Sequence, residues 1–402
     1  MGKKTKKPQI RFAGFTDDWE QRKLGEVGSV SMCRRIFKEQ TSESGDIPFY
    51  KIGTFGGQAD AYISSELFAE YRSKYPYPKE GDILISASGS IGRTVEFTGK
   101  NEYFQDSNIV WLNHDDRLDN AFLKCFYSVV KWAGIEGSTI KRLYNDNILN
   151  TVISMPSVAE QKKIGTFFKE LDNLITLHQR KLDKLKSVKK SMLEKMIPQN
   201  GEVKPEIRFT GFTDDWEQRK LGDVADLVGG GTPNTQNPEY WDGDIDWYAP
   251  AEIADQIYVK TSQRKITEQG YDNSSAKLLP PGTVLFTSRA GIGKTAILTR
   301  KGCTNQGFQS IVPHKNELDT YFIFSRTEEL KRYGELVGAG STFVEVSGKQ
   351  MAAMDLMLPS TIREQQMIGV FFKQLDHLIT LHQRKLEKLQ NIKKAMLEKM
   401  FV

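Results

Sequence analysis

The sequence predicts an α/β protein: two mixed α/β domains separated by two long helices that form an antiparallel coiled coil with pseudo-twofold symmetry. Three observations support this prediction. The chain has 402 residues, which is too long for one ordinary core. Two of its segments occur twice. The longer of these segments has the apolar spacing of a paired helix. The composition, 39% hydrophobic and 27% charged, is typical of a soluble globular protein.

The repeated segments open and close each half of the chain. Residues 10–27 (IRFAGFTDDWEQRKLGEV) match residues 207–224 (IRFTGFTDDWEQRKLGDV) at 16 of 18 positions, and residues 160–196 match residues 364–400 at 27 of 37. The regions between them share only scattered fragments. Drift after a duplication would spread the changes more evenly. We therefore expect the repeated parts to meet one identical partner twice and the divergent parts to meet two different targets.

Each divergent region is expected to be a mixed α/β domain. It contains β-like runs bounded by Gly and Pro, a weaker helical stretch, a Gly-Ser-Thr loop and a short apolar strand that ends in proline. These features lie, in that order, at residues 82–87, 119–132, 137–139 and Pro156 in the first half, and at 283–287, 319–333, 340–342 and Pro359 in the second.

The long repeated segment predicts a helix with a heptad seam, because its apolar positions alternate in steps of four and three. The first helix must lead from one domain to the next, so a paired second helix must run back antiparallel to it. His178 and His382 are expected to be polar seam residues that fix the register, rather than metal ligands. Lys189 and Lys393 are expected to extend from the edge of the seam. The predicted seam residues are Phe168, Leu171, Ile175, His178, Leu182, Leu185, Phe372, Leu375, Ile379, His382, Leu386 and Leu389.

These segments set the predicted domain boundaries. Each mixed domain precedes one long helix, and a linker rich in helix-breaking residues joins the halves. The boundaries are residues 1–157 for the first domain with its basic tail, 158–198 for the central helix, 199–206 for the linker, 207–360 for the second domain and 361–402 for the C-terminal helix.

Two short motifs suggest an enzyme, but their context argues against it. SRAGIGKT (residues 288–295) lacks the first glycine of a phosphate-binding loop, and the following AILTRKG suits a strand better than the required helix. NPEY (residues 237–240) is similar to the base-flipping motif of adenine methyltransferases, but Glu239 replaces a proline and a turn explains the Asn-Pro pair. We therefore expect no catalytic residues in this chain.

Other features of the sequence limit where the protein is located and which cofactors it could hold. No apolar run approaches the roughly 18 residues that a membrane span needs, and no apolar segment follows the basic N-terminus. Cys33, Cys125 and Cys303 are isolated, without a CxxC or a nearby His pair. We expect a cytoplasmic protein with reduced thiols, no membrane contact and no metal site.

The two repeated motifs resemble those of a known protein family. WEQRKLGEV and WEQRKLGDV open the domains, and EQ..IG.FF..LD..I.LHQRKL opens each helix. This order resembles the specificity subunit of type I restriction-modification systems over essentially the whole chain. GGTPNTQNPEYWDGDIDWY (residues 230–248) is also similar to the opening of a target recognition domain in that family.

The resemblance implies a function and a set of partners. Each domain would recognise one half of a bipartite site in double-stranded DNA. The helices would act as a spacer and bind two methyltransferase subunits, and restriction subunits would join that complex. The chain itself would carry no catalytic residues and no cofactor, because S-adenosylmethionine and ATP with Mg²⁺ are expected on the partner subunits only. Domains held roughly 50 Å apart would contact DNA about 15 base pairs apart, leaving a gap in the recognised sequence.

Base contacts are expected from Arg, Lys, Asn, Gln and Ser side chains on loops. The candidates are Ser88, Ser90, Arg93, Lys141, Arg142, Asn145 and Asn147 in the first domain, and Arg289, Lys294, Asn305, Gln306 and Lys349 in the second. Charge gives little guidance: the long repeats carry net charges of +5 and +3, so with the N-terminal lysines set aside the rest of the chain is acidic. Phosphate affinity must then come from local patches, the helix flanks or partner subunits.

One alternative stays open. A coiled-coil scaffold that joins two identical proteins without recognising DNA would also use repeated surfaces. It gives no reason for the two domains to diverge.

Overall fold

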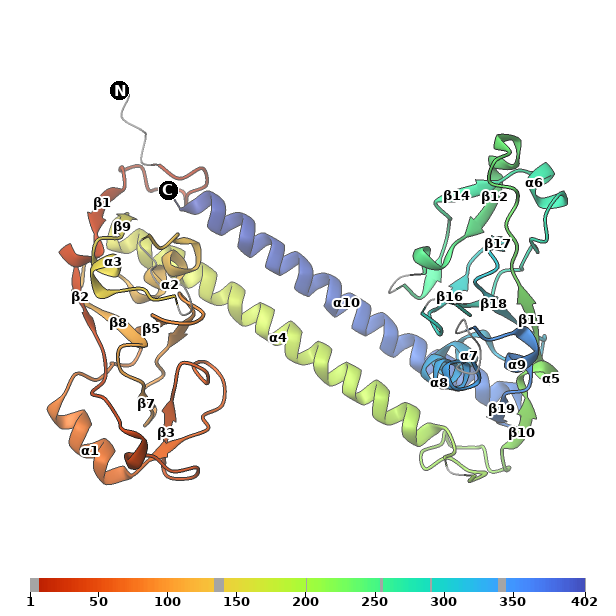
Figure 1. The fold of residues 1–402 in the computed structure, drawn as a ribbon, viewed down its shortest axis with the longest axis horizontal. Helices are drawn as coiled ribbons and strands as arrows, with labels where there is room; N and C mark the ends of the chain where they lie inside the picture. Colours follow the sequence, from red (N-terminus) through yellow and green to blue (C-terminus); the bar gives the residue numbers. More distant parts are fainter. Residues whose placement is uncertain are drawn as a thin grey trace. The chain divides into compact units, whose positions relative to one another are not determined.

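The computed structural model describes residues 7–133, 141–199, 201–253, 256–289, 291–338 and 345–401. The chain divides into two compact units, unit one (residues 1–179 and 384–402) and unit two (residues 180–383) (Figure 1). The long helices α4 (Val158–Met196) and α10 (Ile362–Met400) each contribute one end to each unit. Unit one therefore contains the C-terminal end of α10 as well as the first domain.

Unit one contains three sheets in its described part. A four-stranded antiparallel sheet has the order β2-β8-β5-β6, a three-stranded sheet has the order β4-β3-β7, and β1 pairs with β9. Their bounds are β1 Glu20–Lys23, β2 Gly28–Ser31, β3 Ile47–Tyr50, β4 Tyr62–Ile63, β5 Ile83–Ser86, β6 Thr94–Glu96, β7 Tyr103–Phe104, β8 Ile109–His114 and β9 Val152–Met155. The shorter helices are α1 Ser65–Lys74, α2 Asn120–Val129 and α3 Asn145–Leu149.

Unit two repeats this plan with more strands. A five-stranded sheet has the order β11-β18-β15-β16-β13, a three-stranded sheet has the order β14-β12-β17, and β10 pairs with β19. The strands are β10 Glu217–Lys220, β11 Ala225–Gly229, β12 Trp241–Tyr248, β13 Tyr258–Val259, β14 Arg264–Ile266, β15 Val284–Phe286, β16 Thr295–Leu298, β17 Cys303–Thr304, β18 Gln309–Pro313 and β19 Asp355–Leu358. The shorter helices are α5 Leu221–Val224, α6 Glu268–Asp272, α7 Thr320–Ser325, α8 Thr327–Gly338 and α9 Gly348–Ala352.

The core of each unit lies between its main sheet and a short helix beside the long one. In unit one, strand β5 is buried along its whole length, and Phe122 of α2 is fully buried in the same apolar cluster. Asp119 accepts a hydrogen bond from the Phe122 amide (3.0 Å) and so begins α2. Asp319 begins α7 in the same way, with a bond of 2.8 Å from Phe322. The β-like runs, the helical stretches and the strand after SRAGIGKT predicted from sequence are therefore present.

A buried ion pair joins each N-terminal repeat to its long helix. The Arg11 guanidinium donates to both carboxylate oxygens of Glu160, at 2.6 and 2.7 Å. Arg208 donates to Glu364 at 2.7 and 2.8 Å. The glutamate side chains are 0% and 1% exposed, so these charges depend on their arginine partners. The hydrogen bonds that both arginines donate to these carboxylates raise the pKa of each guanidinium.

The residues after each glutamate complete this joint. Gln161 accepts from the Asp119 amide (2.9 Å), and Gln365 accepts from the Asp319 amide (3.0 Å). A Cβ atom placed on Gly165 would lie 2.6 Å from the Ala121 side chain, so α4 approaches α2 too closely for a side chain. Each EQ..IG motif therefore fixes a domain to the long helix that follows it.

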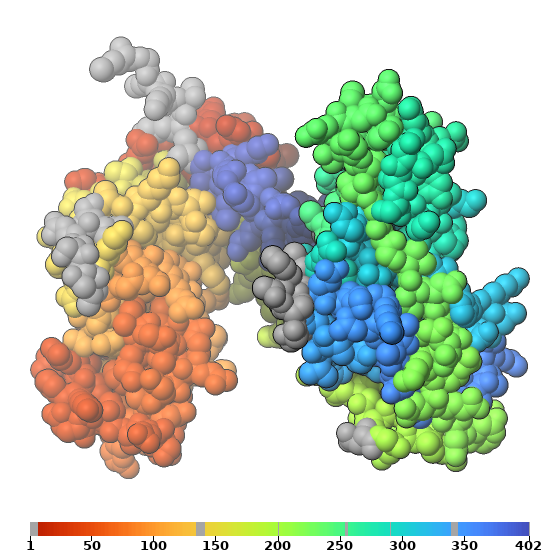
Figure 2. Space-filling model, turned by 45° about the vertical axis from the view of Figure 1, so that its right-hand side comes forward, coloured from red at the N-terminus to blue at the C-terminus, as the bar shows by residue number. Residues whose placement is uncertain are grey.

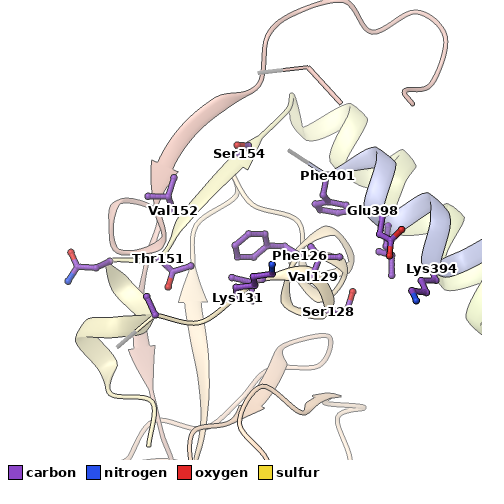
Figure 3. A pocket seen from close by; sticks show the side chains of 14 residues that line it. Phe126, Ser128, Val129, Lys131, Thr151, Val152, Ser154, Lys394, Glu398 and Phe401 are labelled. Carbon is purple, nitrogen blue, oxygen red and sulfur yellow. The ribbon is translucent and has the colours of Figure 1, made fainter. Parts of the chain in front are cut away.

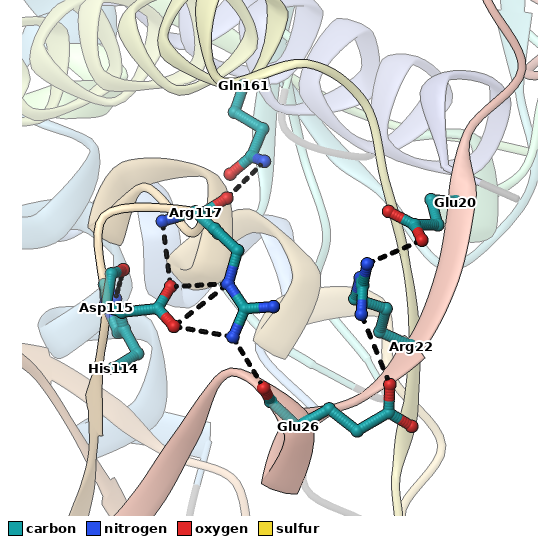
Figure 4. Close-up of polar contacts among 7 residues, drawn as sticks. All are labelled: Glu20, Arg22, Glu26, His114, Asp115, Arg117 and Gln161. Carbon is teal, nitrogen blue, oxygen red and sulfur yellow. Dashed lines mark hydrogen bonds and ion pairs between the residues drawn. The ribbon is translucent and has the colours of Figure 1, made fainter.

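The two units differ in the charges beside this joint. In unit one, Arg117 forms an ion pair with Asp115 at 2.6 Å, and Arg22 pairs with Glu20 at 2.7 Å (Figure 4). In unit two, a glutamate, Glu317, takes the place of Arg117 and pairs with Arg219 at 3.0 Å. Arg22 and Arg219 occupy the same position in the two repeats, but they pair with different residues because the sequences around them differ.

Within each unit the two long helices run antiparallel, as the heptad pattern predicts. In unit one Lys393 pairs with Asp172, and in unit two Lys189 pairs with Asp376, both at 2.6 Å. Tyr321 also donates to Asp376, at 3.0 Å. These lysines do more than extend from the seam edge, because they form ion pairs that fix the register. All the predicted seam residues are buried or half-buried, His178 and His382 among the half-buried ones.

Candidate nucleic-acid interface

In unit one, the predicted loop after β5 (residues 88–93) is folded back by two glycines with positive φ, Gly89 and Gly92. Ser88 is 4% exposed, and its hydroxyl donates to the Asn108 side chain (2.6 Å). Ser88 therefore holds the loop, and its burial argues against a direct base contact. Ser90 and Arg93 are exposed, and Arg93 also donates to the Phe55 carbonyl at 2.7 Å.

The second predicted loop of unit one lies beside the first. Arg142 forms an isolated β-bridge with Ser88, and the Leu143 amide donates to the Ala87 carbonyl (2.8 Å). Lys141, Arg142 and Asn145 are exposed. The Asn147 side chain instead accepts from the Tyr144 amide (3.1 Å) at the start of α3. The structure thus brings the two loops together. The Gly-Ser-Thr loop at residues 137–139 lies outside the described residues.

In unit two, the predicted residues lie on three connected segments. The Ser288 amide donates to the Gly307 carbonyl (2.8 Å), which joins the loop that carries Arg289 and Lys294 to the loop of residues 305–307. The Val346 amide donates to the Ser288 carbonyl at 3.0 Å, which adds the segment before α9 and its exposed Lys349. The Gly-Ser-Thr loop at residues 340–342 is again outside the described residues.

The polar side chains on these segments differ in what they already bind. Arg289 forms an ion pair with Glu345 at 2.7 Å, which offsets its charge. The Asn305 side chain accepts from the Gly307 amide (2.8 Å) and so shapes its own loop. Gln306 and Lys294 are exposed. The base contacts themselves stay predictions, with Gln306 and Lys294 best exposed for them.

One loop of unit one was missed by sequence reasoning. The Gln105 amide donates to the Tyr50 carbonyl (2.9 Å), just as the Asn305 amide donates to the Tyr248 carbonyl (3.0 Å). The Asn108 carbonyl accepts from the Ala87 amide (2.7 Å), as the Gly307 carbonyl accepts from the Ser288 amide (2.8 Å). Residues 105–108 therefore occupy the place of residues 305–307 in unit two, with one residue more. Half-buried Asp106 and Ser107, whose φ is 51°, lie where unit two has Gln306. Alignment of residues 104–109 with residues 304–308, with a gap of one residue, would have found this loop.

Burial determines the chemistry of the three cysteines. Cys33, Cys125 and Cys303 are buried with free thiols. Burial raises the pKa of each thiol to about 12, and the negative charge of Asp106 adds to the effect on Cys33. The three side chains therefore stay as neutral, unreactive thiols at neutral pH.

A cavity of about 850 Å³ opens in unit one between α2, β9 and the end of α10 (Figure 3). Its walls include Phe126, Val129 and Ser154. In unit two the place of Phe126 is taken by Arg326, which donates to the Met357 carbonyl (2.7 Å) and pairs with Glu329. The cavity lies on the joint and not on the loops described above.

Comparison with known sequences assigns the chain. The type I restriction modification DNA specificity domain matches it twice, over residues 16–187 and 213–391. The chain belongs to this family. Each match contains one domain with its loops and most of the long helix that follows, including Glu160 or Glu364, whereas Arg11 and Arg208 precede the matched residues. This assignment confirms the resemblance found in the repeated motifs.

Relatives in the family align mainly with part of the chain. A type I restriction enzyme specificity subunit of Haemophilus influenzae is 60% identical over 157 residues, which cover 38% of this chain and 41% of that protein. The MjaIX specificity subunit of Methanocaldococcus jannaschii is 35% identical over 191 residues, 47% of this chain and 44% of that protein. The aligned regions thus span less than half the length of either relative.

The fold is also that of a solved family structure. The S subunit of a type I restriction-modification system from M. genitalium superposes with a TM-score of 0.67, covering 98% of this chain and 99% of that one at 14% identity. At this identity the likeness shows the fold. Among the helices in the described ranges, none is both long enough and apolar enough to cross a membrane.

Proposed function

We propose that this chain is the DNA sequence-specificity subunit of a type I restriction-modification complex. Each unit recognises one half of a bipartite site in double-stranded DNA. The long helices separate the units and dock two methyltransferase subunits, through which restriction subunits join. The chain supplies recognition and no catalytic group, and S-adenosylmethionine, ATP and Mg²⁺ act on the partner subunits.

The proposal is supported by one difference between parts of the molecule: the joints of the two units match, whereas their loops do not. The joints of the two units use the same residue types in the same hydrogen bonds, as Arg11 with Glu160 and Arg208 with Glu364 illustrate. The loops of the candidate interface differ: half-buried Asp106 and exposed Ser107 lie in the unit-one loop where unit two has exposed Gln306. A carboxylate accepts hydrogen bonds, from cytosine N4 for example, whereas a carboxamide can also donate. Two units with the same framework and different loops are suited to recognise a DNA site with two different halves.

Exchange of one domain is expected to change one half of the recognised sequence. Residues 28–159 would be replaced by the matching region of another family member, and the hybrid would be co-expressed with the methyltransferase. Methyladenine mapped across the host genome should then show a bipartite motif with one new half, an unchanged second half and a fixed gap. The reciprocal exchange of residues 225–363 is the control and should change only the other half. Methylation that follows the methyltransferase alone would favour the scaffold alternative.

The docking surface follows from the repeated residues that the joints do not use. Leu174 and Leu177 on α4 are 45% and 47% exposed, and the identical positions on α10, Leu378 and Leu381, are 41% and 38% exposed. Matching apolar side chains at matching places on two helices suit two copies of one partner. We assign these two leucine pairs to the methyltransferase subunits.

Removal of each leucine pair is expected to release one methyltransferase. The variants Leu174→Ala/Leu177→Ala and Leu378→Ala/Leu381→Ala should each bind one copy, and the fourfold variant none, in mass photometry of the purified complex. Leu336→Ala is the control, because Leu336 is 77% exposed but lies outside the repeats. Two copies on every variant would place the docking surface elsewhere.

A further inference from the structure

The glycine segment, residues 229–232, lies directly against the loop that carries Gln306. It ends strand β11 and leads to Thr232. A Cβ atom on Gly230 would lie 2.0 Å from the Asn305 carbonyl oxygen, and one on Gly231 would lie 2.4 Å from the Ala276 amide. Neither position can hold a side chain. The repeated glycines therefore allow two backbone segments to pack in contact.

Hydrogen bonds on both sides of Gly231 fix this segment in place. Its amide donates to the Thr304 carbonyl at 2.8 Å. Its carbonyl accepts from the indole of buried Trp247, also at 2.8 Å. Strand β12, which carries Trp247, also pairs with β14, so the green and teal parts of unit two adjoin at the surface (Figure 2). Thr232 thus follows a backbone that is held from two directions.

The loop beside it is held equally firmly. Asn305 is bonded through its amide to the Tyr248 carbonyl (3.0 Å) and through its side chain to the Gly307 amide (2.8 Å). The Gly307 carbonyl accepts from Ser288 (2.8 Å). The backbone on either side of Gln306 is therefore fixed, and what remains variable is the orientation of its exposed side chain.

Thr232 controls that orientation, because its hydroxyl donates to the Gln306 side-chain oxygen. A glutamine amide has an accepting oxygen and a donating NH₂ group on opposite sides. With the oxygen turned toward Thr232, the NH₂ group is presented outward. Such a donor matches an acceptor on a base edge, such as purine N7, guanine O6 or thymine O4, and has no match in the major-groove edge of cytosine.

We propose that Thr232 is a positioning residue that orients Gln306 for contact with an acceptor on one base of the second half-site. The inference rests on the proposed function and names a specificity determinant within it. The glycine segment GGGT then has a role beyond that of a turn: it carries the threonine that sets the amide. Unit one has Asp106 and Ser107 in the matching loop. The Asp106 carboxylate needs no such orientation because both of its oxygens accept.

The test compares methylation motifs for variants co-expressed with the methyltransferase. Thr232→Val and Gln306→Ala should relax the same base position in one half-site, lowering discrimination there about tenfold. Thr232→Ser keeps the hydroxyl and should retain the wild-type preference. Thr235→Ala, at an exposed threonine three residues after Thr232, is the matched control. The other half-site should be unchanged throughout, which a merely structural effect on the complex would not produce.

Other outcomes would overturn the inference. If Gln306→Ala relaxes a position that Thr232→Val leaves intact, Thr232 does not position the amide. If Gln306→Ala changes no position, Gln306 is not a base contact. Thr232→Ala provides a second variant without the hydroxyl, and thermal unfolding of each variant checks that its fold is intact. Absence of a bipartite motif in the wild-type complex would instead refute the proposed function.

Discussion

The variant Gly369→Ala is expected to be less stable than the wild type, by about 1–3 kcal/mol in the free energy of unfolding. A Cβ atom at this position would lie 2.6 Å from the Asp319 carboxylate oxygen and 3.1 Å from the Phe322 amide. That carboxylate begins α7, so α7 would have to move away from α10. The sign of the effect is informative, because a glycine-to-alanine change inside an exposed helix normally stabilises it by about 1 kcal/mol.

Denaturant unfolding would measure the change, and hydrogen exchange would locate it in α7 and the adjoining turn of α10. Val370→Ala is the matched control, since Val370 is the next residue of α10 and is 53% exposed. It should change stability by less than about 0.5 kcal/mol. A stabilised Gly369→Ala variant would mean that the two helices do not approach each other as closely as the joint requires. Gly165→Ala should behave in the same way in unit one.

The repeated helical motif shows how far sequence reasoning could go. Its heptad spacing predicted the long helices and the seam, because a period of 3.5 residues is visible in the sequence. The roles of Glu160 and Gly165 within the motif could not be predicted. Their partners, Arg11 and Ala121, are distant in sequence, and no local pattern encodes a close contact between α4 and α2. We expected the repeated residues to contact partner proteins. Many of them instead join each domain to its own long helix.

The candidate DNA contacts stay predictions, but the structure shows what the sequence leaves out about their side chains. The candidate loops lie next to one another within each unit, and sequence cannot tell a buried hydroxyl from an exposed one. Ser88 is buried on Asn108, and Asn147 is bonded at the start of α3. The loop at Asp106 was missed although it carries Gln105 and Ser107. Its position follows from strand β7, only two residues long, which gives little periodic signal.

The variant Arg208→Met is expected to cause the largest loss of stability, about 3–5 kcal/mol in the free energy of unfolding. The Glu364 side chain is 1% exposed and accepts two hydrogen bonds from Arg208. Without the arginine, a carboxylate would remain buried with neither water nor a cation to compensate for its desolvation. Chemical denaturation of the purified chain, followed by circular dichroism, would measure the loss.

A double variant separates the cost of an unpaired charge from the worth of the pair. Arg208→Met/Glu364→Met removes both charges and should be more stable than Arg208→Met alone, since apolar residues of similar volume often replace a buried pair with little loss. Lys220→Met is the surface control: Lys220 and Asp355 pair at 3.1 Å with side chains 55% and 52% exposed, so its loss should cost no more than about 1 kcal/mol. Equal losses for Arg208→Met and Lys220→Met would mean that the joint does not depend on its buried charge. A large difference would explain why Arg and Glu occur at the same places in both halves of the chain: each joint needs both charges or neither, so a change of one residue alone is costly.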